Sequence, residues 1–347
     1  MSKTAVVLFN LGGPDRPEAV QPFLFNLFFD PAIIRLPLPL RWLLAKVISR
    51  RRAPVAQEIY REMGGGSPLL PNTEAQAEAL SAALREKGHG DVRVFIAMRY
   101  WHPRARETAK QVAAFAPDEV VLLPLYPQFS TTTTASSLKE WEREAKVADL
   151  KARTRAVCCY PEETGFIDAV VSELRAALRG MQGDIAPRVL FSAHGLPKKI
   201  VEQGDPYQWQ VEQSVAAVLR RLGEVNLDWQ VCYQSRVGPL EWIGPATDSE
   251  IEKAGREGRP LIVVPIAFVS EHSETLVELD IEYRHLAKKA GVPAYVRVST
   301  VGTDEPFIAG LAGLVAGALA AGRPVCSQSG GRLCPATWRG CPLAMAG

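Results

Sequence analysis

The sequence predicts an α/β protein built from two Rossmann-like, doubly wound lobes, each with a four-stranded parallel sheet. Short runs of Val, Ile and Leu bounded by turn residues alternate with longer segments of helical spacing. The two halves also share local patterns: VVLFNLGGP from Val6 is similar to RVLFSAHGLP from Arg188, and EVVLLPLYPQFS from Glu119 to PLIVVPIAFVS from Pro260. A length of 347 residues suits two domains.

Eight apolar runs are typical of buried parallel strands, with four in each half. They cover 5–11, 92–98, 120–125, 155–160, 188–193, 229–234, 261–267 and 294–299. Helices are expected over 73–87, after Asn72, and over 104–115, 166–178, 205–222, with Pro206 in the first turn, and 270–290. Because the carboxyl ends of parallel strands meet at one edge of a sheet, ligand-binding residues are expected there.

Three domains follow from this pattern. We expect a first lobe over 1–160 that includes an apolar lip at 23–48, and a second lobe over 161–322 in which His194 and a row of glutamates form a candidate metal site. A cysteine-containing tail covers 323–347, because its sequence has neither helical nor strand periodicity.

Charge and hydropathy limit the partners. The 40 Lys and Arg residues balance 38 Asp and Glu residues, so no excess is available to neutralise a nucleic-acid backbone. The lip at 23–48 is interrupted by Asp30, Arg35, Arg41, Lys46 and three prolines, too often for a spanning helix. We expect no export signal at the N-terminus, because its short apolar run is typical of a buried strand. We therefore expect a cytoplasmic protein that contacts the inner face of the membrane peripherally, through the lip.

His194 ends one of the predicted strands and is followed by Gly195, Leu196 and Pro197. An imidazole in this position can ligate a metal or accept a proton near neutral pH. The alternative is a structural histidine that donates to a loop carbonyl.

The segment SEHSETLVELDIEYRH, 270–285, places a row of carboxylates on one helix face. At about 100° per residue, the four glutamates of the row fall within about 80°, whereas His272, Leu276, Leu279 and Tyr283 line the opposite side. The glutamates are Glu271, Glu274, Glu278 and Glu282. A solvated face is the alternative, but the row lacks lysines at i+4 and follows a buried strand. Carboxylates with histidine suit a divalent cation and proton removal.

Polar and aromatic residues collect at other strand ends. Arg99, Tyr100 and Trp101 follow the second strand, and Tyr126, Gln128 and 130–134 follow the third. Tyr233, Gln234, Ser235 and Arg236 end the sixth. Such a mixture suits a flat, anionic, aromatic ligand, because rings stack on its face and cations bind its carboxylates.

Six cysteines form two groups: Cys326, Cys334 and Cys341 in the tail, and Cys158, Cys159 and Cys232 in strands. Three cysteines in a tail that cannot build a core indicate a metal anchor, completed by a thiolate from the body. Reduced, unligated thiols are the alternative. Cys158 and Cys159 cannot be distinguished by strand geometry alone, since successive residues point to opposite faces.

With these residues identified, the chain resembles the ferrochelatases over 5–319. The matching motifs are NLGGP (10–14), GGGSPL (64–69), RYWHP (99–103), YPQFSTTT (126–133), FSAHGLP (191–197), GDPY (204–207), QSRVGPLEWIGPATD (234–248) and VPIAFVSEHSETLVELDIEY (264–283). The resemblance implies a chelatase-like, two-lobed fold, with a porphyrin bound in the cleft between the lobes and ferrous iron as the second substrate.

The resemblance also implies roles for individual residues. His194 and Glu274 would contact the metal and, with Glu278, carry out catalysis. An acidic path for iron or protons would consist of Glu271, Glu278 and Glu282, with His272 as a further participant. Leu11, Arg99, Tyr100, Ser130 and Trp242 would bind the porphyrin. As in some bacterial members, a [2Fe–2S] cluster would be bound by Cys158, Cys326, Cys334 and Cys341.

The expected reaction is insertion of Fe²⁺ into protoporphyrin IX to form protohaem. Coproporphyrin III is an alternative substrate, and a cobalt or nickel chelatase is an alternative of the same superfamily, although the motifs of the second half disfavour it. A non-catalytic haem or metal carrier is the alternative from another class. The oligomeric state stays open.

Overall fold

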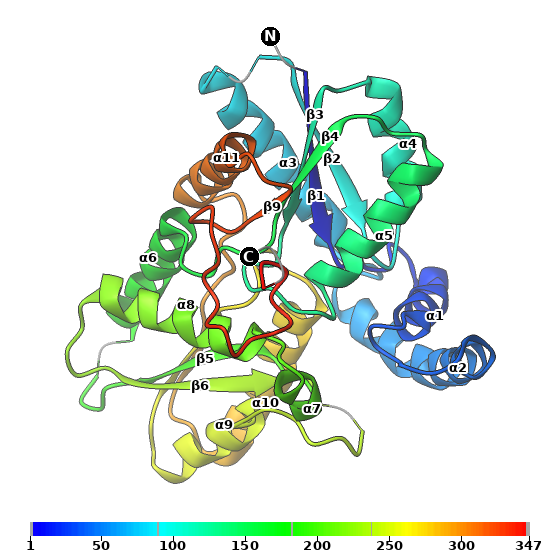
Figure 1. The fold of residues 1–347 in the computed structure, drawn as a ribbon. Helices are drawn as coiled ribbons and strands as arrows, with labels where there is room; N and C mark the ends of the chain where they lie inside the picture. The colour runs from blue at the N-terminus through cyan, green and yellow to red at the C-terminus, as the bar shows by residue number, and fades with distance from the viewer. Residues whose placement is uncertain (1–2, 89, 182, 237, 345–347) are drawn as a thin grey trace. The chain divides into compact units, whose positions relative to one another are not determined.

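The computed structural model describes residues 3–88, 90–181, 183–236 and 238–344. The first two residues of the predicted first lobe, the last three of the predicted tail and position 237 of the QSRVGPLEW motif lie outside the described part. The chain divides into two compact units (Figure 1). One contains the described residues of Met1–Cys159 and Leu311–Arg332, the other those of Tyr160–Gly310 and Leu333–Met345. The C-terminal segment therefore contributes to both units.

The first unit is built on a parallel sheet with the order β2-β1-β3-β4-β9. Its strands are β1 (Thr4–Asn10), β2 (Val92–Met98), β3 (Glu119–Pro124), β4 (Arg153–Val157) and β9 (Val325–Cys326). The expectation of four strands is wrong here, because the tail adds a fifth. β9 pairs with the otherwise free edge of β4, where Cys158 N donates to Cys326 O at 2.7 Å. A strand of two residues has no periodicity that the sequence could reveal.

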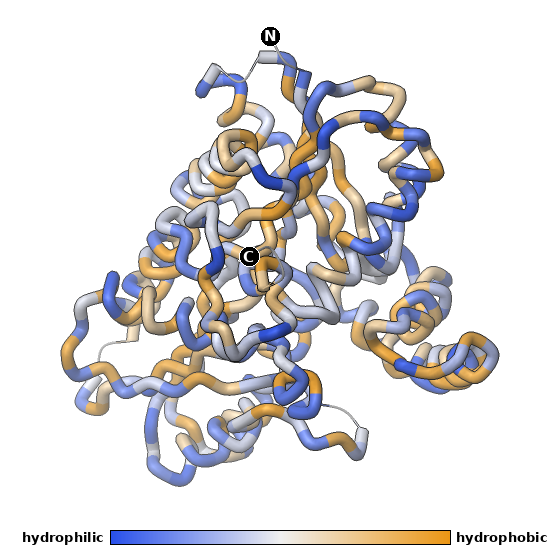
Figure 2. The backbone as a smooth tube through the Cα atoms, viewed as in Figure 1, coloured by the Kyte–Doolittle hydropathy of each residue, from blue (hydrophilic) through white to orange (hydrophobic). Residues whose placement is uncertain are grey.

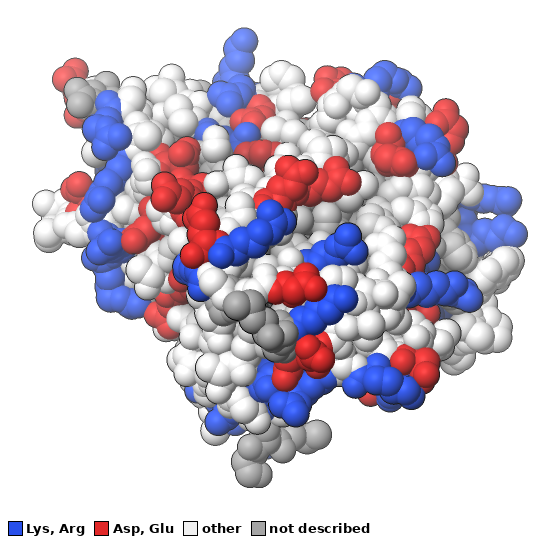
Figure 3. Space-filling model, turned by 90° about the horizontal axis from the view of Figure 1, so that it is seen from above, with Lys and Arg blue, Asp and Glu red and all other residues white. Residues whose placement is uncertain are grey.

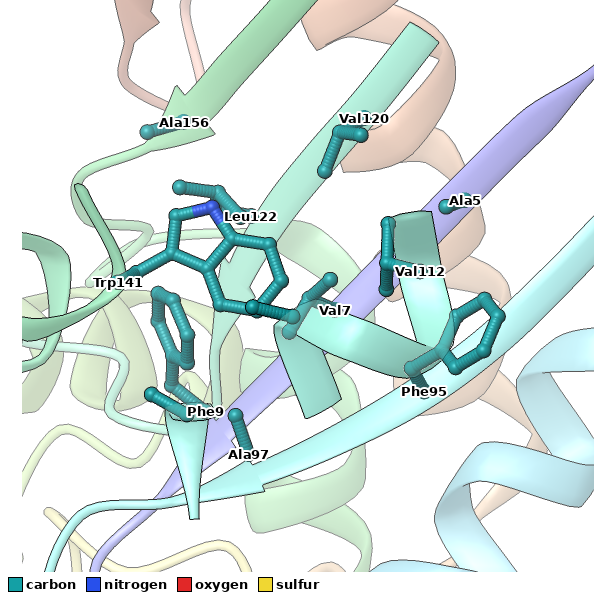
Figure 4. Packing of buried hydrophobic residues seen from close by; sticks show 12 residues of the cluster. Ala5, Val7, Phe9, Phe95, Ala97, Val112, Val120, Leu122, Trp141 and Ala156 are labelled. Carbon is teal, nitrogen blue, oxygen red and sulfur yellow. The ribbon is translucent and has the colours of Figure 1, made fainter. Parts of the chain in front are cut away.

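The core of this unit consists of apolar side chains from the sheet and the helices beside it. Phe9 and Trp141 pack with ring centroids 6.0 Å apart, among Val7, Leu122 and Phe95 (Figure 4). Burying such aromatic side chains stabilises the unit by about 2 to 3 kcal/mol each. This core fixes the carboxyl ends of β1 and β2, from which Leu11 and Arg99 follow.

The second unit has a parallel sheet with the order β6-β5-β7-β8. Its strands are β5 (Arg188–His194), β6 (Asp228–Gln234), β7 (Leu261–Pro265) and β8 (Tyr295–Arg297). The four strands expected here are confirmed. All four are parallel, so their carboxyl ends lie at one edge of the sheet.

Helices connect the strands in both units. They are η1 (Pro17–Ala19), α1 (Val20–Phe29), α2 (Leu38–Glu62), α3 (Leu69–Glu86), α4 (Ala105–Phe115), α5 (Thr134–Val147), α6 (Thr164–Gly180), α7 (Lys198–Glu202), α8 (Tyr207–Leu222), α9 (Thr247–Arg256), α10 (Tyr283–Ala290) and α11 (Glu305–Ala320). The helices expected near 73–87, 104–115, 166–178 and 205–222 are confirmed as α3, α4, α6 and α8.

The single α-helix expected over 270–290 is wrong. Residues before Glu274 form a loop, Glu274–Glu282 form the π-helix η2, and α10 begins only at Tyr283. A π-helix has i→i+5 hydrogen bonds and is rare outside functional sites. Spacing of the apolar residues could not distinguish it from an α-helix.

The lip predicted at 23–48 contains the second half of α1 and the first part of α2, and these two helices pack against each other. Figure 2 shows hydrophobic and hydrophilic residues mixed along both. Large apolar side chains of this segment are exposed, among them Leu38, Leu40, Trp42 and Leu43. Within the described residues, no helix has both the length and the apolar content needed to cross a membrane.

Candidate active site

The site predicted in the second half lies at the carboxyl edge of the second sheet. His194 is the last residue of β5, and its partner in the strand register is Gln234, the last residue of β6. The loop at Ser270–Ser273 and then η2 follow β7. Three neighbouring strand ends thus bring His194, Gln234 and the glutamates of η2 together, as the parallel topology predicts.

Glu274 lies between two imidazoles. Its Oε1 is 3.7 Å from Nε2 of His194, and its Oε2 is 3.6 Å from Nε2 of His272. The Nδ1 of His194 donates to Gly195 O at 2.6 Å, and the Nδ1 of His272 donates to Ser270 O at 3.0 Å. Because the carbonyls accept the Nδ1 hydrogens, both rings present Nε2 to the same carboxylate.

Electrostatics favours an ionised Glu274. Burial alone would raise its pKa, but the charge of His194 and the hydrogen bond and charge of His272 outweigh burial and lower the pKa to about 2. For His272, burial favours the neutral ring, yet the hydrogen bond and charge of Glu274 raise the pKa above its usual 6.5. The pair therefore has a stable negative charge beside an imidazole that is readily protonated.

Glu278 has the opposite electrostatic character. Burial and then the charge of Glu274 raise its pKa above 4.5, although donors partly compensate. Ser235 donates its backbone N–H at 2.8 Å and its hydroxyl at 2.5 Å, Gln234 Nε2 donates at 3.0 Å, and Tyr283 Oη donates at 3.2 Å. Two carboxylates one π-turn apart with displaced pKa values are suited to acid and base roles.

The remaining members of the predicted acidic path lie differently. Glu271 accepts from Arg297 Nη1 at 2.6 Å and from Thr300 N at 2.9 Å. Glu282 is exposed at the end of η2. The expected placement of His272 and Tyr283 opposite the carboxylates is wrong, because His272 precedes the helix and Tyr283 contacts Glu278.

A loop after β6 packs against the turn that follows His194. Gly195 makes this possible: a Cβ there would lie 2.8 Å from Gln234 O and 3.1 Å from Trp242 Cε3. Pro197 and Trp242 form a backbone bridge, so the indole is held beside the end of β5. Within the described part of the chain, the buried Nε1 of Trp242 has no hydrogen-bond partner.

At the strand ends of the first unit, Asp30 is a buried centre. Its Oδ2 accepts from Arg99 Nη2 at 2.7 Å, from Tyr100 Oη at 2.8 Å and from Ser136 Oγ at 2.6 Å. Arg99 also contacts Ser136 through Nε and Glu140 through Nη1. Arg99 is thus bound by three protein partners, and the network joins the lip to the end of β2.

The other two residues predicted around the porphyrin in the first unit, Leu11 and Ser130, follow β1 and β3. Leu11 N donates to Asn10 Oδ1 at 2.8 Å, and Leu11 O accepts from Tyr100 N at 2.9 Å. Ser130 is buried, with its hydroxyl 2.8 Å from that of Thr132.

Sequence comparison is consistent with this geometry. The family model described as Ferrochelatase matches residues 3–319. The chain belongs to the ferrochelatase family. A protein named Ferrochelatase from Phenylobacterium zucineum is 57% identical over 99% of both chains, and one from Caulobacter vibrioides is 55% identical over 98% of this chain and 97% of its own. Ferrochelatases are lyases that insert a metal into a porphyrin.

Among solved structures, "SirB from Bacillus subtilis with Fe3+" has a TM-score of 0.51 and 14% sequence identity, with coverage of 92% of this chain and 96% of its own. A DR2241 structure from Deinococcus radiodurans, described as similar to chelatases, has a TM-score of 0.50. At such low identity these likenesses concern the fold alone. They confirm that this ferrochelatase family member has the α/β fold of chelatases.

The cysteines predicted as cluster ligands are divided between the two units. Cys158 and Cys326 lie on adjacent strand ends of the first unit, and Cys158 Sγ is 3.6 Å from Cys159 Sγ. Burial and then the charge of Cys158 raise the pKa of Cys326 to about 11. In the second unit, Cys334 Sγ accepts from Gln210 Nε2 at 3.1 Å, and Cys341 is buried. Among the described residues, no three His, Cys, Asp or Glu side chains are arranged to hold a metal ion.

Four residues lie around the predicted ones with contacts that the sequence did not indicate, although Gln234 and Ser235 were already grouped among the polar residues at strand ends. Gln234 and Ser235 bind Glu278, and Asp30 binds Arg99 and Tyr100. Tyr207 has a phenol whose pKa is raised by burial and then by the charge of Glu274. Gln234 and Tyr207 belong to motifs that were recognised, but side-chain partners cannot be read from a motif.

Proposed function

We propose that this chain inserts Fe²⁺ into protoporphyrin IX and thereby forms protohaem, the terminal step of haem biosynthesis. The observation that supports the proposal most directly is the carboxylate of Glu274 between the Nε2 atoms of His194 and His272, at 3.7 and 3.6 Å. The carboxylate of Glu274 and the imidazole of His194 are two donors of the kind that ferrous iron accepts, and they suit contact with iron as a substrate. The names of the curated relatives support the same reaction.

Metal insertion requires removal of the two pyrrole N–H protons as the metal enters. We assign proton acceptance to Nε2 of His194, because its Nδ1 hydrogen is bound to Gly195 O and its side chain is 41% exposed. Glu274 stays ionised and contacts the incoming Fe²⁺ substrate. The two protons leave one after the other: Glu278, whose pKa is raised, accepts each from the site and passes it toward the exposed Glu282, so that His194 is free to accept the second.

The porphyrin contacts are proposed for residues at strand ends. Trp242 lies beside the turn after His194, and its unsatisfied Nε1 suits a propionate oxygen. Leu11, Tyr100 and Ser130 are proposed to contact the macrocycle. We propose that Arg99 acts mainly by holding Asp30, since its three nitrogens already have protein partners. Binding energy on the ring can be used to distort the macrocycle toward metalation.

An anaerobic assay tests this function. Purified protein, Fe²⁺ and protoporphyrin IX should give loss of porphyrin fluorescence and appearance of haem, and His194→Ala should reduce the rate by at least about 100-fold. His285→Ala, an exposed histidine on α10, is the matched control and should retain the wild-type rate. Wild-type activity retained by His194→Ala would remove that residue from catalysis.

The porphyrin itself is a separate question with the same readout. Coproporphyrin III presents more propionates than protoporphyrin IX, so parallel assays with both will rank them by kcat/KM. A preference for coproporphyrin III would replace the proposed substrate. Tight porphyrin binding without insertion of Fe²⁺, Co²⁺ or Ni²⁺ would instead favour a carrier.

We also propose a [2Fe–2S] cluster bound by Cys158, Cys326, Cys334 and Cys341. Four buried thiols fit the donor chemistry of such a cluster, and the charge of Cys158 raises the pKa of Cys326, which supports Cys158 over Cys159. When bound, the cluster would cross-link the β4 edge to the C-terminal segment and absorb at roughly 330–550 nm.

The visible spectrum of anaerobically purified protein tests the cluster. The bands should be present in wild type and lost in Cys334→Ser. Cys232→Ser is the control, because Cys232 lies in β6, apart from the proposed ligands. Wild-type protein without these bands, after reconstitution with iron and sulfide, would contradict the proposal.

Finally, we propose peripheral contact of the lip with the inner face of the cytoplasmic membrane. Exposed Leu38, Leu40, Trp42 and Leu43 lie on the same short segment as Arg41 and Lys46, a composition suited to an interfacial helix. On the face in Figure 3, Lys and Arg are interspersed with Asp and Glu. In vesicle sedimentation Trp42→Ser should weaken binding, whereas Trp229→Ser, of equal exposure (45% and 44%), should not.

A further inference from the structure

Arg297, the last residue of β8, contacts the segment that contains η2 at two points. Its Nε and Nη2 donate to Asp280 Oδ2 at 3.0 and 2.6 Å, and its Nη1 donates to Glu271 Oε1 at 2.6 Å. Glu271 precedes η2 by three residues, whereas Asp280 lies within the helix. One planar guanidinium thus holds both sides of the turn that contains Glu274.

The interaction is protected from solvent. The side chain of Arg297 is 8% exposed, and its two carboxylate partners are about a quarter exposed. Charge-assisted bonds of this geometry are stronger than neutral ones, and removing one partner from a buried ion pair leaves the other uncompensated. Thr300 N also donates to Glu271 Oε1 at 2.9 Å, so the carboxylate is fixed from two directions.

The same strand supports the backbone of η2. Tyr295, two residues before Arg297, donates its phenol hydrogen to Leu279 O at 2.7 Å. A π-helix is an uncommon backbone arrangement that requires support from surrounding structure. β8 supplies this support through Tyr295, whereas the carboxylate of Glu278 is held from the end of β6 by Ser235 and Gln234.

The position of η2 affects the contacts that Glu274 can make with a metal. Glu274 lies between Glu271 and Asp280 in the chain, and its oxygens are 3.7 and 3.6 Å from the two imidazoles. A displacement of about 1 Å at a catalytic group can cost about 100-fold in rate. The position of η2 along its axis therefore determines whether Glu274 can contact a cation together with His194.

We propose that Arg297 is a positioning residue for metal insertion, which ties Glu271 to Asp280 and so fixes η2 and Glu274 relative to His194. The expected loss of kcat rests on the proposed function, whereas the expected loosening of η2 does not. It gives Glu271 a positioning role, in place of the role in an acidic path that the sequence suggested.

Arg284 provides a matched control. It donates to Asp280 Oδ1 at 3.2 Å and to Tyr295 O at 2.9 Å, so it touches the same helix and the same strand as Arg297. Its side chain is 49% exposed, and it bonds Asp280 and Tyr295 without reaching the loop before η2 that Arg297 holds through Glu271. An exposed pair of this kind contributes little to stability.

The kinetic test compares Arg297→Gln, Arg297→Lys and Arg284→Gln in the full-length chain. Arg297→Gln should lower kcat for Fe²⁺ insertion at least about 10-fold, with the Kd for protoporphyrin IX changed less than about twofold. Arg297→Lys should recover the melting temperature, because it keeps a positive charge, but not kcat, because an ammonium cannot bridge two carboxylates in the fork geometry. Arg284→Gln should match wild type in all three measurements.

A second measurement is independent of activity. Hydrogen exchange followed by mass spectrometry should show faster exchange of the amides in 274–282 in Arg297→Gln than in Arg284→Gln. Glu271→Gln should reproduce both effects if Arg297→Gln does not fold. Unchanged exchange in η2, or a folded Arg297→Gln or Glu271→Gln with kcat within about twofold of wild type, would overturn the proposal. If wild type inserts no iron while the exchange difference is present, the proposed function fails and the positioning role stands.

Discussion

Ser235 donates both its backbone N–H and its hydroxyl to the carboxylate of Glu278, at 2.8 and 2.5 Å. It does so in a left-handed backbone conformation, with φ of +59°. Such a conformation costs a residue other than glycine about 1 kcal/mol or more. The strain is located where the chain turns from β6 toward Glu278, which is consistent with a functional constraint on the turn.

Replacement of Ser235 separates the backbone from the hydroxyl. Ser235→Gly and Ser235→Ala both remove the hydroxyl, but only glycine adopts φ of +59° without strain. We expect the melting temperature to decrease from wild type to the Gly variant and from the Gly variant to the Ala variant. The free energies of unfolding of the two variants should differ by about 1 kcal/mol. Thermal unfolding measures this order, and an Ala variant as stable as the Gly variant would contradict it.

Glu278 should make the folded state less stable as the pH rises. Burial and the charge of Glu274 raise its pKa above the ordinary 4.5, so the folded state holds this proton more tightly than the unfolded state. The destabilisation is absent below about pH 4.5, grows as the pH rises toward the folded-state pKa, and is complete above it.

Glu278→Gln removes this ionisation. The difference in melting temperature between Glu278→Gln and wild type should therefore be more positive at about pH 8 than at about pH 4, whatever the cost of the altered hydrogen bonds. Glu282→Gln, at an exposed position on the same helix, is the control and should show no such trend. A difference that is constant over this range would refute the expectation.

Much of the fold followed from the sequence because a doubly wound fold has strong local signals. The buried strands, such as β1 and β7, are almost wholly apolar, and this pattern is visible without any partner. Helices α1 and α2 were recognised only as an apolar lip, because Asp30 and the prolines between them break the periodicity. β9 was not predicted, because this two-residue segment is a strand only through its pairing with the edge of β4.

The site was predicted unevenly for a related physical reason. His194 and Glu274 could be placed at one edge because strand topology determines where strand ends lie. The partners of each side chain depend on helix type and on long-range packing. The α-helix expected from the sequence would place His272 on the face opposite Glu274. In the structure His272 precedes the π-helix, and its Nε2 lies 3.6 Å from Glu274 Oε2. The salt bridge of Arg99 with Asp30 joins residues 69 positions apart, which no local pattern reveals.

Asp30 should be among the most important residues for stability in the first unit. It is 4% exposed and binds Arg99, Tyr100 and Ser136 through one oxygen. Asp30→Asn removes the charge and leaves the Arg99 guanidinium partly uncompensated, which should cost about 3 kcal/mol. Glu58→Gln, in the exposed pair with Arg61, should cost less than about 1 kcal/mol. Chemical denaturation of both variants measures the difference, and equal midpoints would contradict the buried network.

Cys232 should be chemically inert in the folded protein. It is fully buried in β6, and burial raises the pKa of its thiol to about 12 despite hydrogen bonds from Thr247 and Ser192. At about pH 8 the thiolate fraction is then on the order of 10⁻⁴, and the thiolate is the nucleophile in alkylation. Iodoacetamide should leave Cys232 unmodified for hours in native protein and label it rapidly in denaturant, as followed by peptide mass spectrometry. Native labelling at the rate of a free cysteine would mean that the second sheet opens at its edge strand, β6. Because Gln234 and Ser235 follow Cys232 at the end of β6 and bind Glu278, the labelling rate also measures how firmly this part of the site is held.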